Sequence, residues 1–408
     1  MRLLICSSIL LYFCEFLNVR DAADFLQSCS EMYALRSRYG IKKAIHNVWI
    51  VKMYQAGFRP RSVYEVTNDC LPNVAFNTIT RLHFRWDVHK PLIVNRSSIL
   101  PSRLLEIEFN NMFDQPLVAD GVCALPASLT RLTLGYEFNQ PLVVDGIRAL
   151  PSHLTYLRFG YNFNQPLIVN GVSALPDEII SLHIRGTFQQ HLIMNGVRAL
   201  PISITDLHID TRFAPSTERN DALPPCLTKL DLSAYPQKEF PSFRLPNTLL
   251  HLVLGCWIDA RQHNMLTLPK SCTQLTFNCC APTKLVNDDD TLWLPNTITN
   301  LTLGNNFNKP LIVKHGRRLI SGLHKGLTHL TFGEMFNQSL YADGVRALPD
   351  SLTHLRLGQD FRQTLVVYGT PVLPANLTHV HFFDPQFRQP KLLVNGVRAL
   401  PDNVVFDF

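Results

Sequence analysis

Leucines alternate with polar residues in short segments that recur along the chain. The pattern Leu-Thr-x-Leu-x-Leu-Gly, or a close variant of it, occupies residues 129–135, 154–160, 298–304, 327–333 and 352–358. Successive side chains of a strand point to opposite faces, so alternate leucines share one face and the Thr, His and Arg residues between them share the other. Each segment is therefore predicted to be a β-strand with one buried face and one polar, solvent-facing side.

These strands belong to a repeat. Leu-Pro pairs stand 22 to 29 residues apart, except for one double gap that holds a degenerate copy near Leu319 and Ile320. Counting that copy, the chain contains fourteen units, and chance does not produce such a spacing. The leucines of the thirteen pairs are Leu71, Leu100, Leu125, Leu150, Leu175, Leu200, Leu223, Leu245, Leu268, Leu294, Leu348, Leu373 and Leu400.

The stretch between two strands has a pattern of its own. A glycine permits the turn out of the strand, and a phenylalanine then inserts into the core. A short apolar stretch follows and ends in Asp-Gly or Asn-Gly, which are strong turn dipeptides, while the prolines keep the return path extended. The string Phe-Asn-Gln-Pro-Leu, or a near copy, begins at Phe113, Phe138, Phe163, Phe188, Phe307, Phe336, Phe361 and Phe387.

The repeat unit is too small to fold alone. A unit of about 25 residues cannot bury its own apolar face, so neighbouring units must stack, with parallel strands about 4.8 Å apart. The units between Leu200 and Leu294 are shorter and lack the Phe-Asn motif. We expect irregular coils there around an unbroken core.

The combined motif carries a family resemblance. Leu-Thr-x-Leu-x-Leu-Gly followed by Phe-Asn-Gln-Pro-Leu and Asn-Gly-Val resembles the FNIP repeat, a variant of the leucine-rich repeat, over roughly residues 64–408. The resemblance implies a protein-interaction solenoid. With the stacking argument, it predicts a β-rich, leucine-rich-repeat-like solenoid with a parallel β-sheet and about 14 coils over residues 71–408, preceded by a small N-terminal α-helical module at 1–50 and a connecting segment at 51–70.

Composition narrows the class of protein. The 408 residues carry 38 Lys and Arg against 32 Asp and Glu, a net charge of +6, and 46% of them are hydrophobic. This excludes a disordered polyelectrolyte. The basic residues are scattered without a run of five, which argues against a nucleic-acid partner. The ten Cys form no Cys-x-x-Cys pair, which favours reduced thiols in a cytosol-like compartment.

Motifs of catalysis are missing from the sequence. It holds no Gly-x-Ser-x-Gly, no His-Glu-x-x-His, no Walker loop and no dinucleotide fingerprint. Because repeats fill the chain, no room remains for an enzyme domain. We therefore expect a non-catalytic binding protein without catalytic residues, metal site or cofactor.

The first sixty residues lack the repeat and admit three interpretations. Residues 1–17 are apolar after Arg2, as in a signal peptide or membrane anchor, but Glu15 interrupts the run and no small-x-small cleavage site follows. The run is also shorter than the roughly 20 residues that span a bilayer. A plain N-terminal cap of the solenoid is the second interpretation. The third is a helical module, because apolar residues recur at three- and four-residue steps.

The helical interpretation carries a second resemblance. The string Phe-Leu-Asn-Val-Arg-Asp-Ala-Ala-Asp-Phe-Leu-Gln-Ser-Cys-Ser-Glu-Met-Tyr-Ala-Leu-Arg is similar to an F-box over about residues 5–48, with Ile5-Cys6 where the family usually has Leu-Pro. F-box proteins dock on the Skp1 adaptor of cullin-based ubiquitin ligases. Carried over by position, the adaptor-binding residues are Ile9, Leu10, Phe13, Phe16, Leu17, Phe25 and Leu26, which could equally form the module's own core.

The two resemblances together imply a function. The chain would be the substrate-recognition subunit of an SCF-type ubiquitin ligase in the cytoplasm of a eukaryotic or host cell. A Skp1-like adaptor and a protein target would be its partners, and neither membrane nor nucleic acid would be. The alternative is a stand-alone repeat scaffold, secreted or surface-displayed, that binds protein or glycan.

Histidines are frequent on the predicted polar strand face, which we expect to be the concave one. His329, His354 and His379 would form a ladder across neighbouring coils, with Arg356 and His381 in the column beside it. One hypothesis is a partner-binding patch for an acidic protein, strengthened near or below about pH 6.5; the other is a polar face that merely tolerates His. The histidines between strand leucines are His83, His183, His208, His251, His329, His354, His379 and His381.

A few further residues stand out. Cys256 and Cys279 occupy equivalent places in neighbouring coils, with Cys280 beside them, so a disulfide or a soft metal would fit, although buried inert thiols are commoner. The tryptophans that break the repeat, as core filling or as surface anchors, are Trp86, Trp257 and Trp293.

Overall fold

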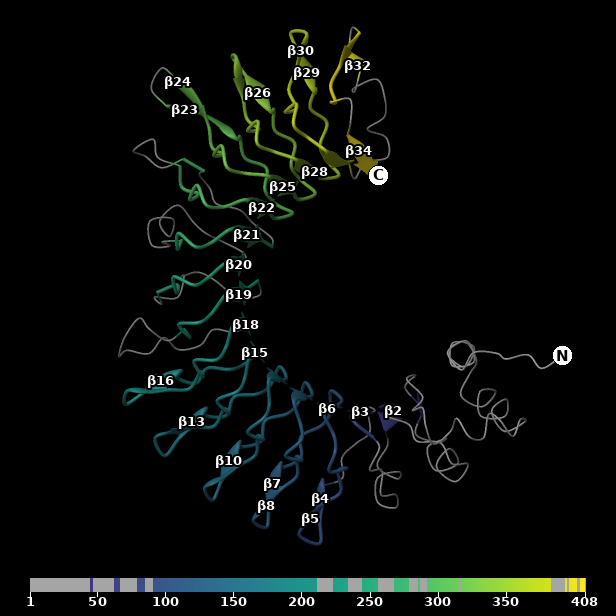
Figure 1. The fold of residues 1–408 in the computed structure, drawn as a ribbon, viewed down its shortest axis with the longest axis vertical. Coiled ribbons are helices and arrows are strands. Elements are labelled where there is room, and N and C mark those ends of the chain that lie inside the picture. Colours follow the sequence, from purple (N-terminus) through teal and green to yellow (C-terminus); the bar gives the residue numbers. More distant parts are fainter. Residues whose placement is uncertain are drawn as a thin grey trace, which may run out of the picture. The chain divides into compact units, whose positions relative to one another are not determined.

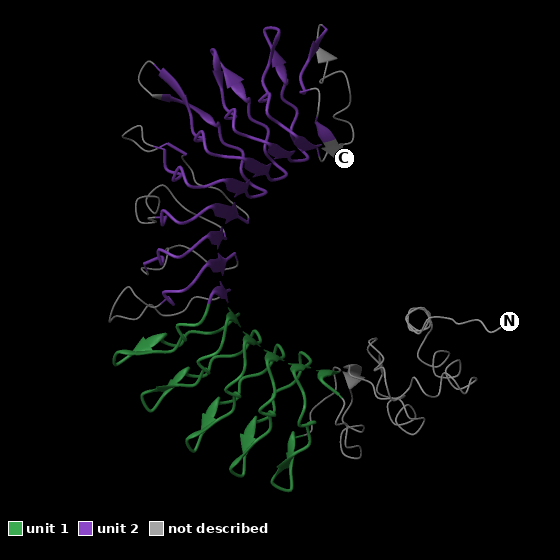
Figure 2. Ribbon diagram, in the orientation of Figure 1, with its two compact units in different colours: residues 1–204, 213–218 green, residues 205–212, 219–408 purple. Residues whose placement is uncertain are grey.

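Two compact units make up the fold. The computed structural model describes residues 45–46, 62–66, 79–84, 91–210, 223–233, 244–255, 268–278, 285–286, 292–315, 318–382, 393–394, 396–401 and 404–407. Unit 1 comprises residues 1–204 and 213–218, and unit 2 comprises residues 205–212 and 219–408 (Figure 2). No helix occurs in the described ranges, and so none of sufficient length and apolarity to cross a membrane is found there.

In unit 1 a parallel sheet holds one strand from each coil. Its strands follow one another in chain order, each pairing with the next (Figure 1). They are β1 (Ile45–His46), β2 (Ser62–Val66), β3 (Arg81–Phe84), β6 (Glu106–Glu108), β9 (Arg131–Thr133), β12 (Tyr156–Arg158) and β15 (Ser181–Ile184).

Unit 2 repeats this arrangement. Its parallel strands again pair in chain order. They are β18 (Asp206–Ile209), β19 (Lys229–Leu232), β20 (His251–Leu254), β21 (Gln274–Phe277), β22 (Asn300–Leu303), β25 (His329–Phe332), β28 (His354–Leu357), β31 (His379–Phe382) and β34 (Val405–Asp407).

Many coils add a short antiparallel hairpin at the end remote from the parallel sheet (Figure 1). Five of the hairpins turn through an Asp-Gly or Asn-Gly pair in which both residues have positive φ, such as Asp145 (50°) and Gly146 (79°); this is the backbone of a type I′ turn. In unit 1 the hairpins are β4 (Ile93–Val94) with β5 (Ser97–Ser98), β7 (Val118–Ala119) with β8 (Val122–Cys123), β10 (Val143–Val144) with β11 (Ile147–Arg148), β13 (Ile168–Val169) with β14 (Val172–Ser173), and β16 (Ile193–Met194) with β17 (Val197–Arg198).

Unit 2 has hairpins of the same kind. The first is longer than the others, with four residues in each strand. The pairs are β23 (Ile312–His315) with β24 (Arg318–Ser321), β26 (Tyr341–Ala342) with β27 (Val345–Arg346), β29 (Val366–Val367) with β30 (Thr370–Pro371), and β32 (Leu393–Val394) with β33 (Val397–Arg398).

The core of each unit consists of apolar columns that run from coil to coil. The central strand leucines are at most 3% exposed, and those phenylalanines of the Phe-Asn motif that the structure describes are at most 2% exposed. Those phenylalanines stack in parallel: Phe138 and Phe163 have ring centroids 6.2 Å apart in unit 1, and Phe336 and Phe361 lie 6.1 Å apart in unit 2. The predicted parallel β-solenoid with a leucine and phenylalanine interior is confirmed, whereas the total of about 14 coils stays a prediction.

Hydrogen bonds tie each coil to the one before it at equivalent positions. The hydroxyl of Thr155 donates to the carbonyl oxygen of Thr130 at 3.1 Å, and the backbone N–H of Asn164 donates to Oδ1 of Asn139 at 3.0 Å. Both pairs are 25 residues apart. The contacts that close the core are therefore contacts between neighbours, as expected for a solenoid.

The glycine that ends the strand is needed because of close packing between coils, not because the turn requires its conformational freedom. Gly135 and Gly160 do not have positive φ, so left-handed freedom is not used. A Cβ atom on Gly160 would instead lie 1.6 Å from the carbonyl oxygen of Gly135. Close approach of successive coils thus demands glycine at this place.

The domain division inferred from sequence stays a prediction. The helical module at 1–50 and the connecting segment at 51–70 lie outside the described residues, apart from β1 and β2.

Candidate partner-binding surface

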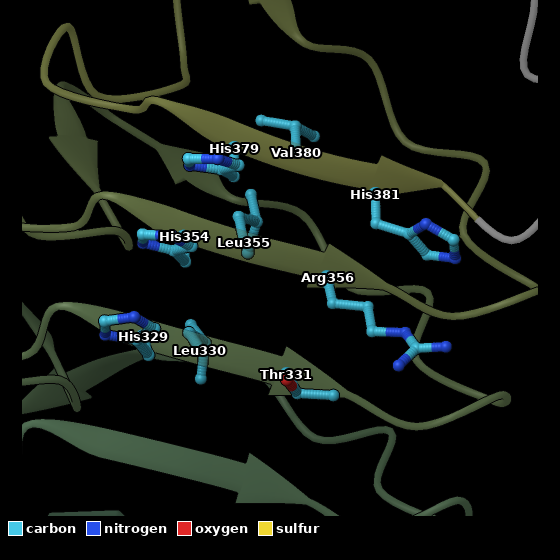
Figure 3. A pocket seen from close by; sticks show the side chains of 9 residues that line it. All are labelled: His329, Leu330, Thr331, His354, Leu355, Arg356, His379, Val380 and His381. Carbon is cyan, nitrogen blue, oxygen red and sulfur yellow. The ribbon is translucent and has the colours of Figure 1, made fainter. Parts of the chain in front are cut away.

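Two polar columns cross β25, β28 and β31 on the face of the sheet opposite the leucines. His329, His354 and His379 are aligned in register in the first column. Arg356 and His381 are aligned in the second, beside Thr331 (Figure 3). Between the columns Leu330, Leu355 and Val380 are buried. The strand alternation of the sequence is what separates the columns, since residues two apart share a face.

The three histidines of the first column form what we call the histidine stack. The rings of His329 and His354 are parallel within 12°, with centroids 4.1 Å apart, and those of His354 and His379 are parallel within 7° at 4.3 Å. Parallel rings direct their nitrogen lone pairs alongside one another rather than toward one point. In the described part of the chain, no group of three or more His, Cys, Asp or Glu residues could hold a metal ion.

Threonine hydroxyls set the orientation of each ring. Nδ1 of His354 lies 2.9 Å from Oγ1 of Thr353, and the hydroxyl of Thr353 donates its only proton to the carbonyl oxygen of Thr328 at 3.1 Å. Nδ1 of His354 must therefore carry a proton and donate it to the hydroxyl oxygen. This leaves Nε2 as the atom that gains or loses a proton.

The same pair of bonds recurs at the other two rings of the histidine stack. Thr328 and Thr378 each lie 2.9 Å from the Nδ1 of the following histidine and each donate to a carbonyl of the preceding coil at 3.1 Å. All three Nε2 atoms thus occupy the same edge of the stack.

The columns line a shallow pocket with a volume of about 160 Å³. Its nine lining residues include four histidines and Arg356, and none of them is a carboxylate (Figure 3). Burial lowers the pKa of His354, and the neighbouring His329 and His379 lower it further. The central imidazole is therefore neutral at pH 7 and resists protonation more than an isolated histidine would.

The equivalent face of unit 1 carries paired charges instead. Arg81 on β3 lies 3.2 Å from Glu106 on β6, and Nδ1 of His83 lies 2.8 Å from Oε2 of Glu108. These pairs are also in register. Carboxylates thus partner the basic and imidazole side chains there, while the histidine stack has imidazoles on both sides of its central ring.

Sequence reasoning missed one cluster on this face of unit 2. His208 lies between two carboxylates, with Nε2 at 2.6 Å from Asp210 and Nδ1 at 2.9 Å from Asp231. Burial alone would lower the pKa of His208, but the hydrogen bonds and charges of Asp210 and Asp231 outweigh it and raise the pKa to about 9. Asp231 stands 23 residues after His208, so the repeat spacing was the signal that could have found it.

The environment of Asp231 also favours a charged pair with His208. Burial would raise its pKa, yet the hydrogen bonds from His208 and from the backbone N–H of Ser233 (2.8 Å) lower it to about 2. The pair is thus ionised across the neutral range. The exposed fraction of each of the three side chains is between 15% and 21%, so the cluster is a half-buried link between β18 and β19 rather than an open site.

Several residues singled out in the sequence have no described environment. The seven predicted adaptor-binding residues lie outside the described residues, as do Cys256, Cys279, Cys280, Trp86 and Trp257. Trp293 is half-buried and lies 6.0 Å from the ring of Phe277. Elsewhere in the core, burial raises the pKa of the Cys272 thiol to about 11, which makes it inert.

Comparison with known proteins identifies the repeats. The model of the FNIP repeat matches residues 113–162, 146–185 and 318–360. The chain contains FNIP repeats. The predicted repeat type is thereby confirmed, and the matched segments carry the strands, phenylalanines and hairpins described above.

Solved structures of leucine-rich-repeat proteins are similar to this chain. CroV588, described as a novel circular LRR protein, has 29% sequence identity and a TM-score of 0.54, over 85% of this chain and 52% of that chain. This chain therefore spans about half the length of CroV588. An LRR protein from Leptospira interrogans has 15% identity and a TM-score of 0.36, over 88% of this chain and 98% of that chain. Comparison with curated proteins gave no match.

Proposed function

We propose that the protein is a non-catalytic substrate receptor, in which the polar strand face binds a protein target and the N-terminal segment docks on a Skp1-like adaptor of an SCF-type ubiquitin ligase. The observation that carries the binding half is the in-register display of polar side chains on a sheet backed by leucine. Leucines fix the strand positions, so the polar residues between them are free to determine which partner fits.

Proximity is the mechanism that this architecture supports. A receptor that holds a target beside a ligase raises the effective concentration of the reacting groups without forming a covalent bond itself. Such a receptor needs a rigid surface and a docking segment and no catalytic residues. A cytoplasmic location in a eukaryotic or host cell follows from the proposed adaptor.

The adaptor half rests on the resemblance of residues 5–48 to an F-box. It is tested by expressing the full chain in eukaryotic cells and identifying what co-purifies. We expect a Skp1-like adaptor to co-purify with the full chain, and to be lost when residues 1–60 are deleted or when Leu10→Asp and Phe13→Asp are combined. Replacing each residue of the histidine stack by glutamine is the matched control and should leave adaptor binding intact.

A full chain that is processed at its N-terminus and retains its protein or glycan partner without any adaptor would contradict the ligase proposal. That result would instead support the stand-alone scaffold, since the solenoid would then bind its partner unaided.

A further inference from the structure

The histidine stack lacks the acidic neighbours found at other histidines of the strand face. His83 pairs with Glu108, and His208 lies between two aspartates. Across the residues that the structure describes, His329, His354 and His379 form no ion pair with a carboxylate. Their ring neighbours are instead one another. A negative group that belongs to another molecule would therefore find an edge of three Nε2 atoms that no carboxylate of the described residues occupies.

Protonation and anion binding reinforce each other at such an edge. Because adjacent rings lie only 4.1 and 4.3 Å apart, a charge on one ring opposes a charge on the next. A carboxylate placed against the edge offsets this repulsion between charged rings, so the carboxylate binds more tightly to the protonated stack than to the neutral one. By linkage, the bound anion in turn raises the affinity of the stack for protons.

The charged group nearest the histidine stack favours a bound anion. Arg356 lines the same pocket and is exposed. Along the first column, the stack is bordered by Asn300 on β22 and Val405 on β34, both uncharged. Along the second column, His381 is in register with Asp407. Among these bordering register positions, Asp407 is thus aligned with the second column and not with the stack.

We propose that the histidine stack binds an acidic, extended segment of the protein target, and that proton uptake by the stack strengthens this binding as the pH falls below neutrality. The proposal rests on the proposed function of the solenoid as a protein-binding surface. The occupant is a peptide chain because the stack runs across three strands. In an extended chain, side chains on one face recur about every 6.6 Å, which is less than the two ring spacings of 4.1 and 4.3 Å taken together. Flexible Glu side chains cover the difference and reach the outer rings.

Fluorescence anisotropy with labelled synthetic peptides tests the proposal on the full chain. One peptide alternates Glu with Ser, a second has Gln in place of Glu, and a third has the Glu residues in one block. Uptake of one proton on binding makes Kd fall about tenfold per pH unit while the free stack is neutral. We therefore expect the alternating peptide to bind about tenfold or more tightly at pH 5.5 than at pH 7.5, and more tightly than either other peptide.

Substitution of the stack must abolish the pH dependence. His354→Gln should reduce it and the triple change of His329, His354 and His379 to Gln should remove it, whereas His83→Gln, at a histidine already paired with Glu108, should leave it unchanged. Circular dichroism checks that each variant retains its strands.

Equal affinity for the Glu and Gln peptides, an unchanged Kd between the two pH values, or unaltered binding by the triple variant would each overturn the proposal. The proposed function fails separately, if no adaptor co-purifies in the experiment above, because adaptor binding is expected to be independent of the stack.

Discussion

At the scale of single residues, the strand-ending glycine shows how closely the coils approach. Gly160 has no room for a Cβ atom, since the carbonyl oxygen of Gly135 would lie 1.6 Å away. Gly146, at a hairpin tip, has open space where a Cβ atom would lie, but its φ is positive. Geometry therefore requires these two glycines for different reasons, one because of a close contact and one because of its backbone conformation.

Alanine substitutions distinguish these two reasons. We expect Gly160→Ala to lower the free energy of unfolding by about 3 kcal/mol or more, because backbone must shift to relieve the contact. Gly146→Ala should cost about 1 kcal/mol, the strain of a left-handed non-glycine residue. Urea unfolding followed by circular dichroism measures both, and a larger loss for Gly146→Ala would contradict the packing explanation.

Residue detail also marks where sequence reasoning ends. The repeat alone places His354 beside His329 and His379. The bond from Nδ1 of His354 to the Thr353 hydroxyl depends on side-chain rotamers, which no repeat spacing determines. The role of the stack in binding stays a prediction that the peptide experiment addresses.

At the scale of elements, β18 and β19 are joined by an ion pair that depends on pH. The pKa of His208 rises from 6.5 to about 9 in the folded state, so its contribution to stability is complete below pH 6.5 and is lost as the pH rises through 9. The pKa of Asp231 falls from 3.8 to about 2, so its contribution is complete above pH 3.8 and is lost as the pH falls through 2. The link is strongest between those limits, at about pH 4 to 6.5.

Replacement of His208 tests this link. We expect His208→Gln to destabilise the protein most at pH 4 to 6.5 and progressively less as the pH approaches 9, because the imidazolium charge is then absent from the wild type as well. His153→Gln is the control, since His153 and its neighbour Glu178 are exposed and surface pairs contribute little. Chemical unfolding at a series of pH values gives the differences. A deficit that grows as the pH rises from 6.5 to 9 would be inconsistent with the raised pKa of His208.

The sequence predicts the strands of the parallel sheet better than it predicts the hairpins. Alternation of leucine and polar residues predicts β9 and β12 because it extends over enough positions to define a period. The Asp145-Gly146 pair predicts a turn. The antiparallel pairing of β10 with β11 was not foreseen, because each strand has two residues and no period can be read from so few. The 23-residue spacing of two units places Asp231 of β19 opposite His208 of β18, and a pattern confined to one unit does not contain that contact.

At the scale of the whole molecule, the contacts that hold the fold together are made between adjacent coils. Phe138 contacts the phenylalanines of the coils on either side, at 6.0 and 6.2 Å. Unit 2 has its own phenylalanine stack around Phe336. Stability in such an architecture approximates a sum over coils and their interfaces.

A core substitution should therefore act locally. We expect Phe138→Ala to cost about 4 kcal/mol and to accelerate amide hydrogen exchange in β9 and β12, while exchange in β28 and β31 stays unchanged. Phe138→Leu serves as the milder control and should affect the same strands to a smaller extent. Hydrogen-exchange mass spectrometry resolves these segments, and equal acceleration in β28 and β31 would show that the solenoid instead unfolds as one cooperative unit.

The identical spacing of contacts has a consequence for how such a protein changes length. Thr155 donates to the carbonyl oxygen of Thr130, and Asn164 donates to the side-chain oxygen of Asn139. In each pair, donor and acceptor belong to the same residue type at the same position of successive coils. Excision or duplication of one full 25-residue period between Phe113 and Phe188 joins ends that already fit, so unequal recombination within the gene yields a longer or shorter protein whose seam matches those of the neighbouring 25-residue coils. The number of coils can then vary between lineages by whole units while the polar columns diverge one side chain at a time.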